Sequence, residues 1–300
     1  MKLNHFEDVN EYYDRVKPYL IQHEAHHNLI FGMIDSLRSQ PEYFTHPPYL
    51  VTVQEDDHVA TVAIRTPPRK LVLSRTAASN SANVPNASLN LQALNTIAQD
   101  LHARQELIPG VIAPVDEAQA FVQAWQAVTS QSYRLAMRQR VYQLESVKPV
   151  HKANGHFRQA TLADFNLLVN WCQKFYQEAS GEATKYDETK RTIDRHLKKN
   201  ALFLWQDKVP VCVASFSGLT PNGIRIGFVY TPPQYRRNGY ASSCVAALSQ
   251  TLIDRGHKYC FLFTDLANPT SNHIYQAIGY QPVADINDYV FESYSPNKSL

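Results

Sequence analysis

The stretch that decides the fold of this chain is Ile226-Gly-Phe-Val-Tyr-Thr-Pro-Pro-Gln-Tyr-Arg-Arg-Asn-Gly-Tyr-Ala241. It predicts a short apolar strand that ends at Pro232-Pro233, then a basic turn, then a helix that begins at Gly239. The free N–H groups and the positive dipole end of a helix N-terminus favour an anion. Gly239 has no side chain to keep that anion from the backbone, and Arg236 and Arg237 add forked donors. The turn therefore predicts a site for an anion, and we expect a diphosphate.

Two nucleotide-binding motifs are excluded at this turn. It contains no Gly-Lys-Ser/Thr, so it is not a P-loop, and its single glycine excludes the G-x-G-x-x-G fingerprint. What remains, Arg236-Arg-Asn-Gly239-Tyr-Ala241, resembles the R-x-x-G-x-A signature of the GNAT superfamily of N-acetyltransferases, whose loop wraps the diphosphate of coenzyme A. On these residues alone, a basic turn that caps a surface helix stays open as the plainer alternative.

A second motif, Asn268-Pro-Thr-Ser271-Asn-His-Ile274-Tyr275-Gln-Ala-Ile-Gly279-Tyr280, follows one predicted helix and one predicted strand later. Asn268 and Pro269 predict a helix start, with the asparagine as N-cap. The whole stretch resembles, position by position, the N-x-x-[A/S]-x-x-[L/I]-Y-x-x-x-G-[F/Y] pattern that GNAT enzymes carry after their fifth strand. Two motifs in the required order make a GNAT fold the expectation for residues 156–292.

The rest of the chain predicts an α/β protein (an α+β mixed sheet) made of tandem GNAT-like domains, a degenerate one over 1–150 and a complete one over 151–300. Both halves give the same order of elements: two helices, three strands, a helix, a strand, a helix and closing strands. The helices are expected at 5–40 (two of them), 88–104, 116–129, 161–175, 187–199, 239–255 and 270–278. The strands are expected at 49–54, 59–65, 70–74, 110–113, 132–147, 156–160, 201–205, 209–216, 224–230, 259–263 and 281–291. Where the second half has its basic turn, the first has Arg75–Ala82 without a glycine, so one active site is expected. The chain also resembles bacterial two-domain acetyltransferases whose N-terminal half is a degenerate copy.

Composition sets the class of partner that we expect. The net charge of the 300 residues is +2, and the basic clusters are short, so no nucleic-acid partner is expected. The longest apolar runs have the length of strands, which predicts no membrane span, and the N-terminus has acidic residues where a signal peptide would be apolar. Cys172, Cys212, Cys244 and Cys260 show no C-x-x-C spacing, which is typical of buried free thiols in a reducing cytoplasm. His23 and His27 have the spacing of two zinc ligands, but no third ligand is evident, so no metal is expected.

The GNAT resemblance implies acetyl-CoA as the cosubstrate and assigns residues to bind it. The strand that ends at Thr231 would pair its backbone with the pantetheine arm, the turn would hold the diphosphate, and the second motif would contact pantetheine or the thioester. The implied binding residues are Val229, Tyr230, Thr231, Arg236, Arg237, Asn238, Gly239, Tyr240, Ala241, Asn268, Ser271 and Asn272.

The implied reaction is direct transfer of an acetyl group from the thioester to an amine. A backbone N–H near Val229 or Tyr230 would polarise the carbonyl, and Tyr275 would donate a proton to the leaving thiolate, since a phenol with a pKa of about 10 stays protonated at neutral pH. Many family members have a glutamate on the strand that precedes the turn, but this strand has none. The general base therefore stays open among a water chain, Asp265 and Glu178.

The acceptor is expected to be a small amine or a peptide amine, bound by a monomer or a homodimer. The resemblance points to a set of acceptor-side residues: Phe175, Tyr176, Glu178, Tyr186 and Tyr289. Two alternatives stay open, a non-catalytic module that binds acetyl-CoA and another protein, and an acyltransferase that uses a longer acyl-CoA.

Overall fold

The computed structural model describes residues 1–77, 86–181 and 185–292. Contacts divide the chain into two compact units. Unit 1 comprises Met1–Val141, Thr264–Ala267 and Val283–Leu300, and unit 2 comprises Tyr142–Phe263 and Asn268–Pro282. Each unit is described by itself below.

Unit 1 is a sheet between two pairs of helices. Its strands follow the order β1-β2-β3-β4-β5-β12-β6, and β4 runs parallel to β5 whereas β1, β2 and β3 pair antiparallel. The strands are β1 (Lys2–His5), β2 (Tyr49–Glu55), β3 (His58–Arg65), β4 (Leu71–Leu73), β5 (Gly110–Pro114), β6 (Tyr133–Leu144) and β12 (Gln281–Phe291). The helices are α1 (Val9–Leu20), α2 (Asn28–Ser39), α3 (Asn86–Ala103) and α4 (Val115–Thr129).

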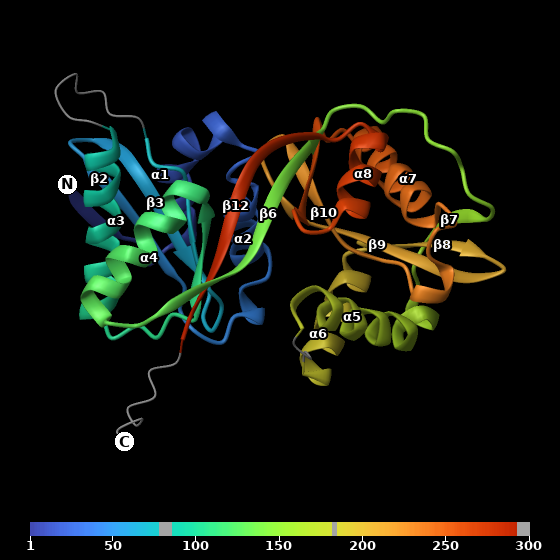
Figure 1. The fold of residues 1–300 in the computed structure, drawn as a ribbon, viewed down its shortest axis with the longest axis horizontal. Helices are drawn as coiled ribbons and strands as arrows, with labels where there is room; N and C mark the ends of the chain where they lie inside the picture. The colour runs from blue at the N-terminus through green and yellow to red at the C-terminus, as the bar shows by residue number, and fades with distance from the viewer. Residues whose placement is uncertain (78–85, 182–184, 293–300) are drawn as a thin grey trace. The chain divides into compact units, whose positions relative to one another are not determined.

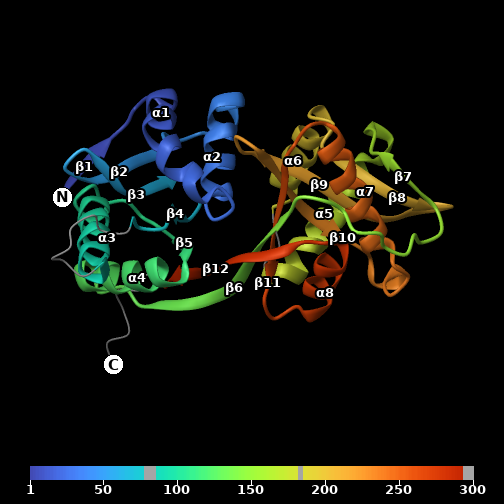
Figure 2. The ribbon, with the colours of Figure 1, turned by 90° about the horizontal axis from the view of Figure 1, so that it is seen from above.

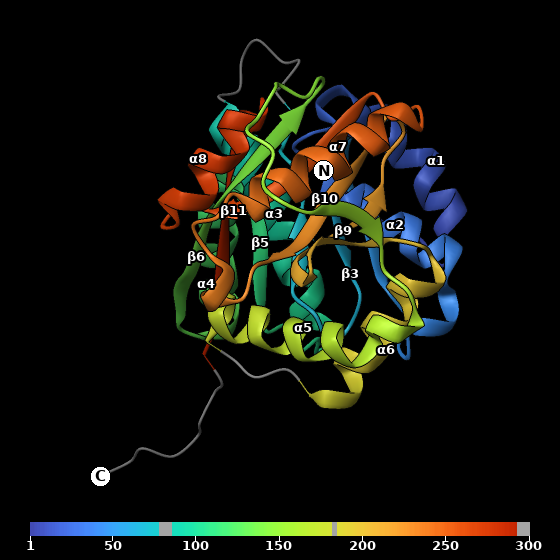
Figure 3. The same ribbon diagram turned by 90° about the vertical axis from the view of Figure 1, so that its right-hand side faces the viewer.

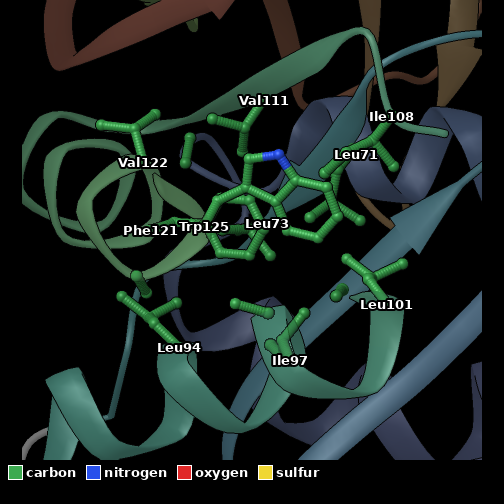
Figure 4. Packing of buried hydrophobic residues seen from close by; sticks show 14 of the residues in the cluster. Leu71, Leu73, Leu94, Ile97, Leu101, Ile108, Val111, Phe121, Val122 and Trp125 are labelled. Atoms are coloured by element: carbon green, nitrogen blue, oxygen red, sulfur yellow. The ribbon is translucent and has the colours of Figure 1, made fainter. Parts of the chain in front are cut away.

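The alternation of apolar residues along these strands gives unit 1 one core on each face of the sheet. On β2, Val51 and Val53 contact α3 and α4, whereas Leu50 contacts α1 and α2. Figure 2 shows the two helix pairs on opposite sides of the strands. Trp125 of α4 is the largest side chain of the α3–α4 core and packs among leucines and isoleucines of α3 and β4, with Ile108 and Val111 beside them (Figure 4).

Unit 2 repeats this arrangement. Its strands follow the order β6-β11-β10-β9-β8-β7, with β10 parallel to β11 and the others of β7–β10 antiparallel. The strands are β7 (His156–Gln159), β8 (Leu202–Asp207), β9 (Val209–Leu219), β10 (Gly223–Tyr230) and β11 (Tyr259–Asp265). The helices are α5 (Phe165–Ser180), α6 (Tyr186–Lys198), α7 (Tyr240–Asp254) and α8 (Pro269–Ile278). Helices α5 and α6 cover one face, and α7 and α8 cover the other (Figure 3).

The closing strand of each half lies in the sheet next to the fifth strand of the other half. Strand β12, from the C-terminal half, pairs antiparallel with β5 from Ile286 opposite Pro114 to Val290 opposite Gly110. On its other side β12 runs beside β6 (Figure 1). Strand β6, from the N-terminal half, is the neighbour of β11, and its residues Tyr142 and Leu144 belong to the α7–α8 core of unit 2. Unit 1 thus includes Val283–Phe291 of β12, and unit 2 includes Tyr142–Leu144 of β6.

The α/β fold class is confirmed, and so are several local signals. The helix expected from 161 begins with a capping box that Thr161 and Asp164 form. Asn268 is the N-cap of α8, and its side chain accepts from the N–H of Ser271. Strand β1 was not predicted, and the expected closing strands at 281–291 are a single strand, β12. Of the glycine-free stretch Arg75–Ala82, residues 78–82 lie outside the described residues.

Candidate functional site

Strand β10 carries a β-bulge in the segment that the resemblance predicts to lie at the thioester. Opposite β9, Gly227 pairs with Ser215 and Tyr230 pairs with Val213, so the segment between them holds one extra residue. Phe228 lies in that segment with φ of 44°, an uncommon conformation for a bulky residue. The bulge interrupts the antiparallel ladder at Phe228 and Val229, so their backbone groups are turned away from regular pairing.

The parallel pairing of β10 with β11 ends before the bulge. Its register runs from Gly223 opposite Tyr259 to Arg225 opposite Phe261, whereas β10 continues to Tyr230. A Cβ added at Gly227 would meet no atom within 4 Å. The second part of β10 therefore has a stretch of backbone with room beside it.

The turn after β10 leads directly into helix α7. A short 3₁₀ segment, Pro233–Tyr235, precedes Arg236, and Arg237 takes a left-handed conformation with φ of 64°. Gly239 is the N-cap of α7 at φ of 75°, and it offers no side-chain acceptor to the first N–H groups of the helix. The Tyr240 hydroxyl donates to Asp207 at 2.7 Å, which ties the first turn of α7 to the end of β8.

The two arginines of the turn differ. Arg237 is exposed, whereas Arg236 is engaged: its Nε donates to the carbonyl of Thr231 at 2.9 Å, and its Nη2 donates to Glu178 Oε2 at 2.6 Å. Glu178 Oε1 also accepts from the Tyr230 hydroxyl at 3.2 Å. Burial, and next the Glu178 charge, raise the pKa of Tyr230. The end of α5, the end of β10 and the turn therefore meet at one carboxylate.

Thr231, between the bulge and the turn, has an unsatisfied polar atom. Its Oγ1 is buried and has no hydrogen-bond partner among the residues that the structure describes. Buried hydroxyls are normally hydrogen-bonded, so the Thr231 hydroxyl is a candidate to form a hydrogen bond with a bound ligand. With the bulge and the helix start that lacks a side-chain cap, it fits an extended ligand that runs from β10 to α7. Asn238 Nδ2 donates to the carbonyls of Tyr235 and Arg236 at 3.2 and 3.1 Å, which holds the turn in shape.

The polar residues of α8 form a second group. Asn272 Nδ2 donates to the carbonyl of Asn268 at 2.7 Å, and its Oδ1 accepts from the Tyr142 hydroxyl at 3.0 Å. Gln276 also donates to that hydroxyl, at 3.3 Å. Tyr142 was missed by sequence reasoning because it occupies an ordinary buried position of a predicted strand. It fixes the side chain of Asn272.

Tyr275 lies beside this group. The ring of Tyr142 is 6.4 Å from that of Tyr275, centroid to centroid, and Tyr275 is 8% exposed. Burial, with a smaller contribution from Cys212, raises the pKa of Tyr275 far above that of an ordinary phenol. Among the described residues, its hydroxyl has no recorded hydrogen-bond partner. Val229, Tyr240 and Ala241 border the same core cluster as Tyr275.

Some of the expected acceptor-side residues pack near the bulge, and others do not. Phe175 contacts both Tyr176 and Phe228, each with ring centroids 5.4 Å apart, so the end of α5 packs on the bulge. Tyr186 is exposed at the start of α6. The expectation for Tyr289 is wrong: it lies on β12 opposite Val111 and is buried in the α3–α4 core of unit 1, with its hydroxyl donating to Gln119 at 2.7 Å.

Asp265, one of the residues considered as base, lies in the Thr264–Ala267 segment of unit 1, and its carboxylate accepts from the N–H of Ala267 at 2.8 Å. Within 1–77, 86–181 and 185–292, no three histidine, cysteine or acidic side chains gather as a metal ion would require. No helix in that part of the chain combines the length and apolarity needed to cross a bilayer.

Solved structures share this fold along almost the whole chain. A Drosophila protein is 12% identical, with 98% of this chain and 99% of that one covered and a TM-score of 0.68. A GCN5-related N-acetyltransferase from Sphaerobacter thermophilus is 14% identical, with 96% and 95% covered and a TM-score of 0.62. A tandem GNAT protein from the clavulanic acid biosynthesis pathway is 13% identical, with 97% and 98% covered and a TM-score of 0.53. The chain therefore has a tandem GNAT-like fold.

The family comparison agrees with the fold. Residues 217–289 match the family model described as FR47-like protein, and this range includes β10, the basic turn, α7 and α8. The resemblance to GNAT N-acetyltransferases is confirmed by this match together with the shared fold. No curated protein matches the sequence.

Proposed function

We propose that this protein is an acetyl-CoA-dependent N-acetyltransferase whose single active site lies in the C-terminal half. The observation that carries the proposal is the path from the bulge at Phe228 through Thr231 to Gly239, which joins backbone freed from the β-ladder to a helix start without a side-chain cap. Backbone groups at the bulge, the Thr231 hydroxyl and the first N–H groups of α7 follow one another along this path. A thioester, a pantetheine arm and a diphosphate need this order of partners.

In this proposal the turn and the bulge bind acetyl-CoA. The N–H groups from Arg237 to Ala241 hold the diphosphate with the help of the α7 dipole, and Arg236 and Arg237 add charge. The backbone from Val229 to Thr231 pairs with the pantetheine arm. Asn268, Ser271 and Asn272 border the thioester end, where the hydrogen bond from Tyr142 fixes the orientation of Asn272.

The chain's residues then support attack of a neutral amine on the thioester carbonyl, which forms a C–N bond and breaks the C–S bond. A backbone N–H of the bulge, at Val229 or Tyr230, stabilises the negative charge that develops on the carbonyl oxygen. Tyr275 donates its proton to the departing thiolate and regains one from water, and the raised pKa of this phenol means that it is protonated at neutral pH before the next turnover. The amine's own proton leaves to water or to Glu178, whose carboxylate lies at the end of β10.

The same surface suggests where the amine arrives. Phe175 brings an aromatic ring to the bulge, Tyr176 packs against Phe175, and Glu178 brings a negative charge that suits a cationic amine. A small amine or a peptide amine fits these groups.

We also propose that 1–150 and 151–300 are two copies of one fold and that the first copy has no cofactor loop. In this proposal the protein acts in the cytoplasm as a monomer or homodimer.

The test is calorimetric titration of the full chain with acetyl-CoA and with coenzyme A, followed by a thiol-release assay over a panel of small and peptide amines. We expect micromolar binding of both cofactors and thiol release with at least one amine. Binding without release on the whole panel would favour a non-catalytic module, and faster release from longer acyl thioesters would favour a different acyltransferase. No binding of coenzyme A would overturn the proposal.

A further inference from the structure

The guanidinium of Arg236 has two competing uses. Its Nε and Nη2 donate to the Thr231 carbonyl and to Glu178 Oε2, at 2.9 and 2.6 Å. Its Cζ lies 5.9 Å from the centre of the Tyr230 ring. The side chain is therefore directed toward the end of β10, although Arg236 opens the turn that we propose to hold a diphosphate.

The ion pair between Arg236 and Glu178 is easily broken. The two side chains are 45% and 47% exposed, and ion pairs this accessible to water contribute little to stability. A diphosphate is a stronger partner, because it carries more negative charge than one carboxylate and accepts two parallel N–H bonds from an arginine. A diphosphate bound at the start of α7 would compete with Glu178 for the same guanidinium.

Glu178 lies close enough to the bulge that losing its ion pair with Arg236 would change the charge there. Its other oxygen accepts from the Tyr230 hydroxyl, and Tyr230 closes the bulge on β10. Phe175, one turn earlier on α5, contacts Phe228 of the bulge. Without Arg236, Glu178 would present an uncompensated negative charge beside the proposed position of the thioester.

We propose that Arg236 exchanges partners: the diphosphate of coenzyme A displaces Glu178 from it, and the released carboxylate then receives the cationic amine acceptor. The inference rests on the proposed function and adds a regulation of the same site. Cofactor binding and acceptor binding are coupled through one arginine. Arg236 has two alternative partners, the diphosphate and Glu178. The carboxylate of Glu178 is free to bind the amine only when Arg236 is bound to the diphosphate.

The experiment is calorimetric titration of coenzyme A into the full chain and into Glu178→Gln, Arg236→Gln and the double variant. Glu178 is half-exposed, so its replacement leaves the core intact. Glu188→Gln is the matched control. Glu188 is an exposed glutamate of α6, and its substitution removes the same charge at a position away from Arg236. Pantetheine, which lacks the diphosphate, is the control ligand.

We expect Glu178→Gln to bind coenzyme A about two- to fivefold more tightly, the range that an exposed ion pair of this kind supports. The gain should vanish in the Arg236→Gln background and with pantetheine, and Glu188→Gln should bind like the unchanged chain. Unchanged or weaker binding by Glu178→Gln, or an equal gain without Arg236, would overturn the exchange and leave the proposed function intact. Absence of coenzyme A binding by the unchanged chain would overturn both.

Discussion

Tyr275 is the residue on which the proposed chemistry depends most directly. Replacing it with phenylalanine removes the hydroxyl and keeps the ring contacts with Tyr142 and Tyr280. We expect kcat to fall about tenfold or more with little change in the KM for acetyl-CoA, because a general acid acts on the leaving thiolate and not on cofactor binding. Steady-state kinetics of thiol release measures both constants.

Tyr259→Phe is the control for this substitution. Tyr259 lies at the start of β11 opposite Gly223, far along the strand from the bulge. Both constants should be unchanged in this variant. A kcat for Tyr275→Phe equal to that of the unchanged chain would remove Tyr275 from catalysis and leave the binding residues as they are.

At the scale of residues, the sequence predicts contacts between residues close in the chain better than contacts between residues far apart. The helix caps at Asn268 and Thr161 follow from neighbours three positions away, which is why they could be predicted. The pairing of Arg236 with Glu178 joins residues 58 positions apart, and no local pattern indicates it. Phe228 gives no sign of its left-handed backbone either, since such conformations are typical of glycine or asparagine.

At the scale of elements, helix α7 offers a matched pair of glycines. Gly239 and Gly256 flank its two ends at φ of 75° and 95°. An added Cβ would meet nothing closer than Ala153 at 3.8 Å in the first case and nothing within 4 Å in the second. Each Gly→Ala substitution should therefore cost about 1–2 kcal/mol of stability through backbone strain alone.

The two substitutions should differ in cofactor binding. In Gly239→Ala the new methyl group stands between the first N–H groups of α7 and the diphosphate, so Kd for coenzyme A should rise about tenfold or more, the loss of roughly one charge-assisted hydrogen bond. In Gly256→Ala the Kd should stay the same. Calorimetry and thermal denaturation on both variants make the comparison, and equal Kd values would exclude a diphosphate at this helix start.

Elements were easier to predict than their pairing. Alternating apolar residues placed the strands of both halves within a few residues, and apolar residues at helical spacing placed the helices. The pairing of β12 with β5 joins residues 172 to 180 positions apart (286 − 114 and 290 − 110), and periodicity carries no information on which sheet a strand joins. The expectation for Tyr289 failed for this reason.

At the scale of the whole molecule, acid should destabilise the N-terminal unit through His27. Burial, opposed in part by a hydrogen bond to the Leu20 carbonyl, lowers the pKa of His27 to about 3. Its other nitrogen, Nε2, accepts from the N–H of Arg75 at 3.2 Å, so the folded chain holds the neutral ring. Below pH 6.5 His27 is protonated in the unfolded chain but neutral in the folded chain. The free energy of unfolding therefore falls by about 1.4 kcal/mol per pH unit until the pH reaches the pKa of His27 in the folded chain.

Urea titrations at pH 7 and pH 5 test this expectation. The free energy of unfolding should fall between these pH values, and in His27→Gln that fall should be smaller by about 2 kcal/mol. His58→Gln, at an exposed position that begins β3, should retain the full pH dependence. An identical pH dependence in His27→Gln and the unchanged chain would contradict a neutral buried ring.

The two halves should also fail to fold separately. A fragment of residues 1–150 lacks β12, so β5 keeps only β4 as a neighbour and the core loses Tyr289 and Phe291. The ring centroid of Phe291 lies 5.8 Å from that of Trp125. An unpaired apolar strand edge favours aggregation. We expect no cooperative thermal transition for 1–150, and recovery of one when 281–292 is joined to residue 141 through a Gly/Ser linker. A cooperative transition in 1–150 alone would contradict this dependence on β12.

The placement of β6 makes the C-terminal half depend on side chains from the N-terminal half. Tyr142, encoded in the first half of the gene, orients Asn272 and contacts Tyr275 in the second half. A deletion of residues 1–150 would thus remove a side chain that orients a residue of the proposed site, and a gene fission near residue 150 would leave each product without its closing strand. Under the proposed function, selection on the site in the C-terminal half would therefore act on both halves as one inherited unit.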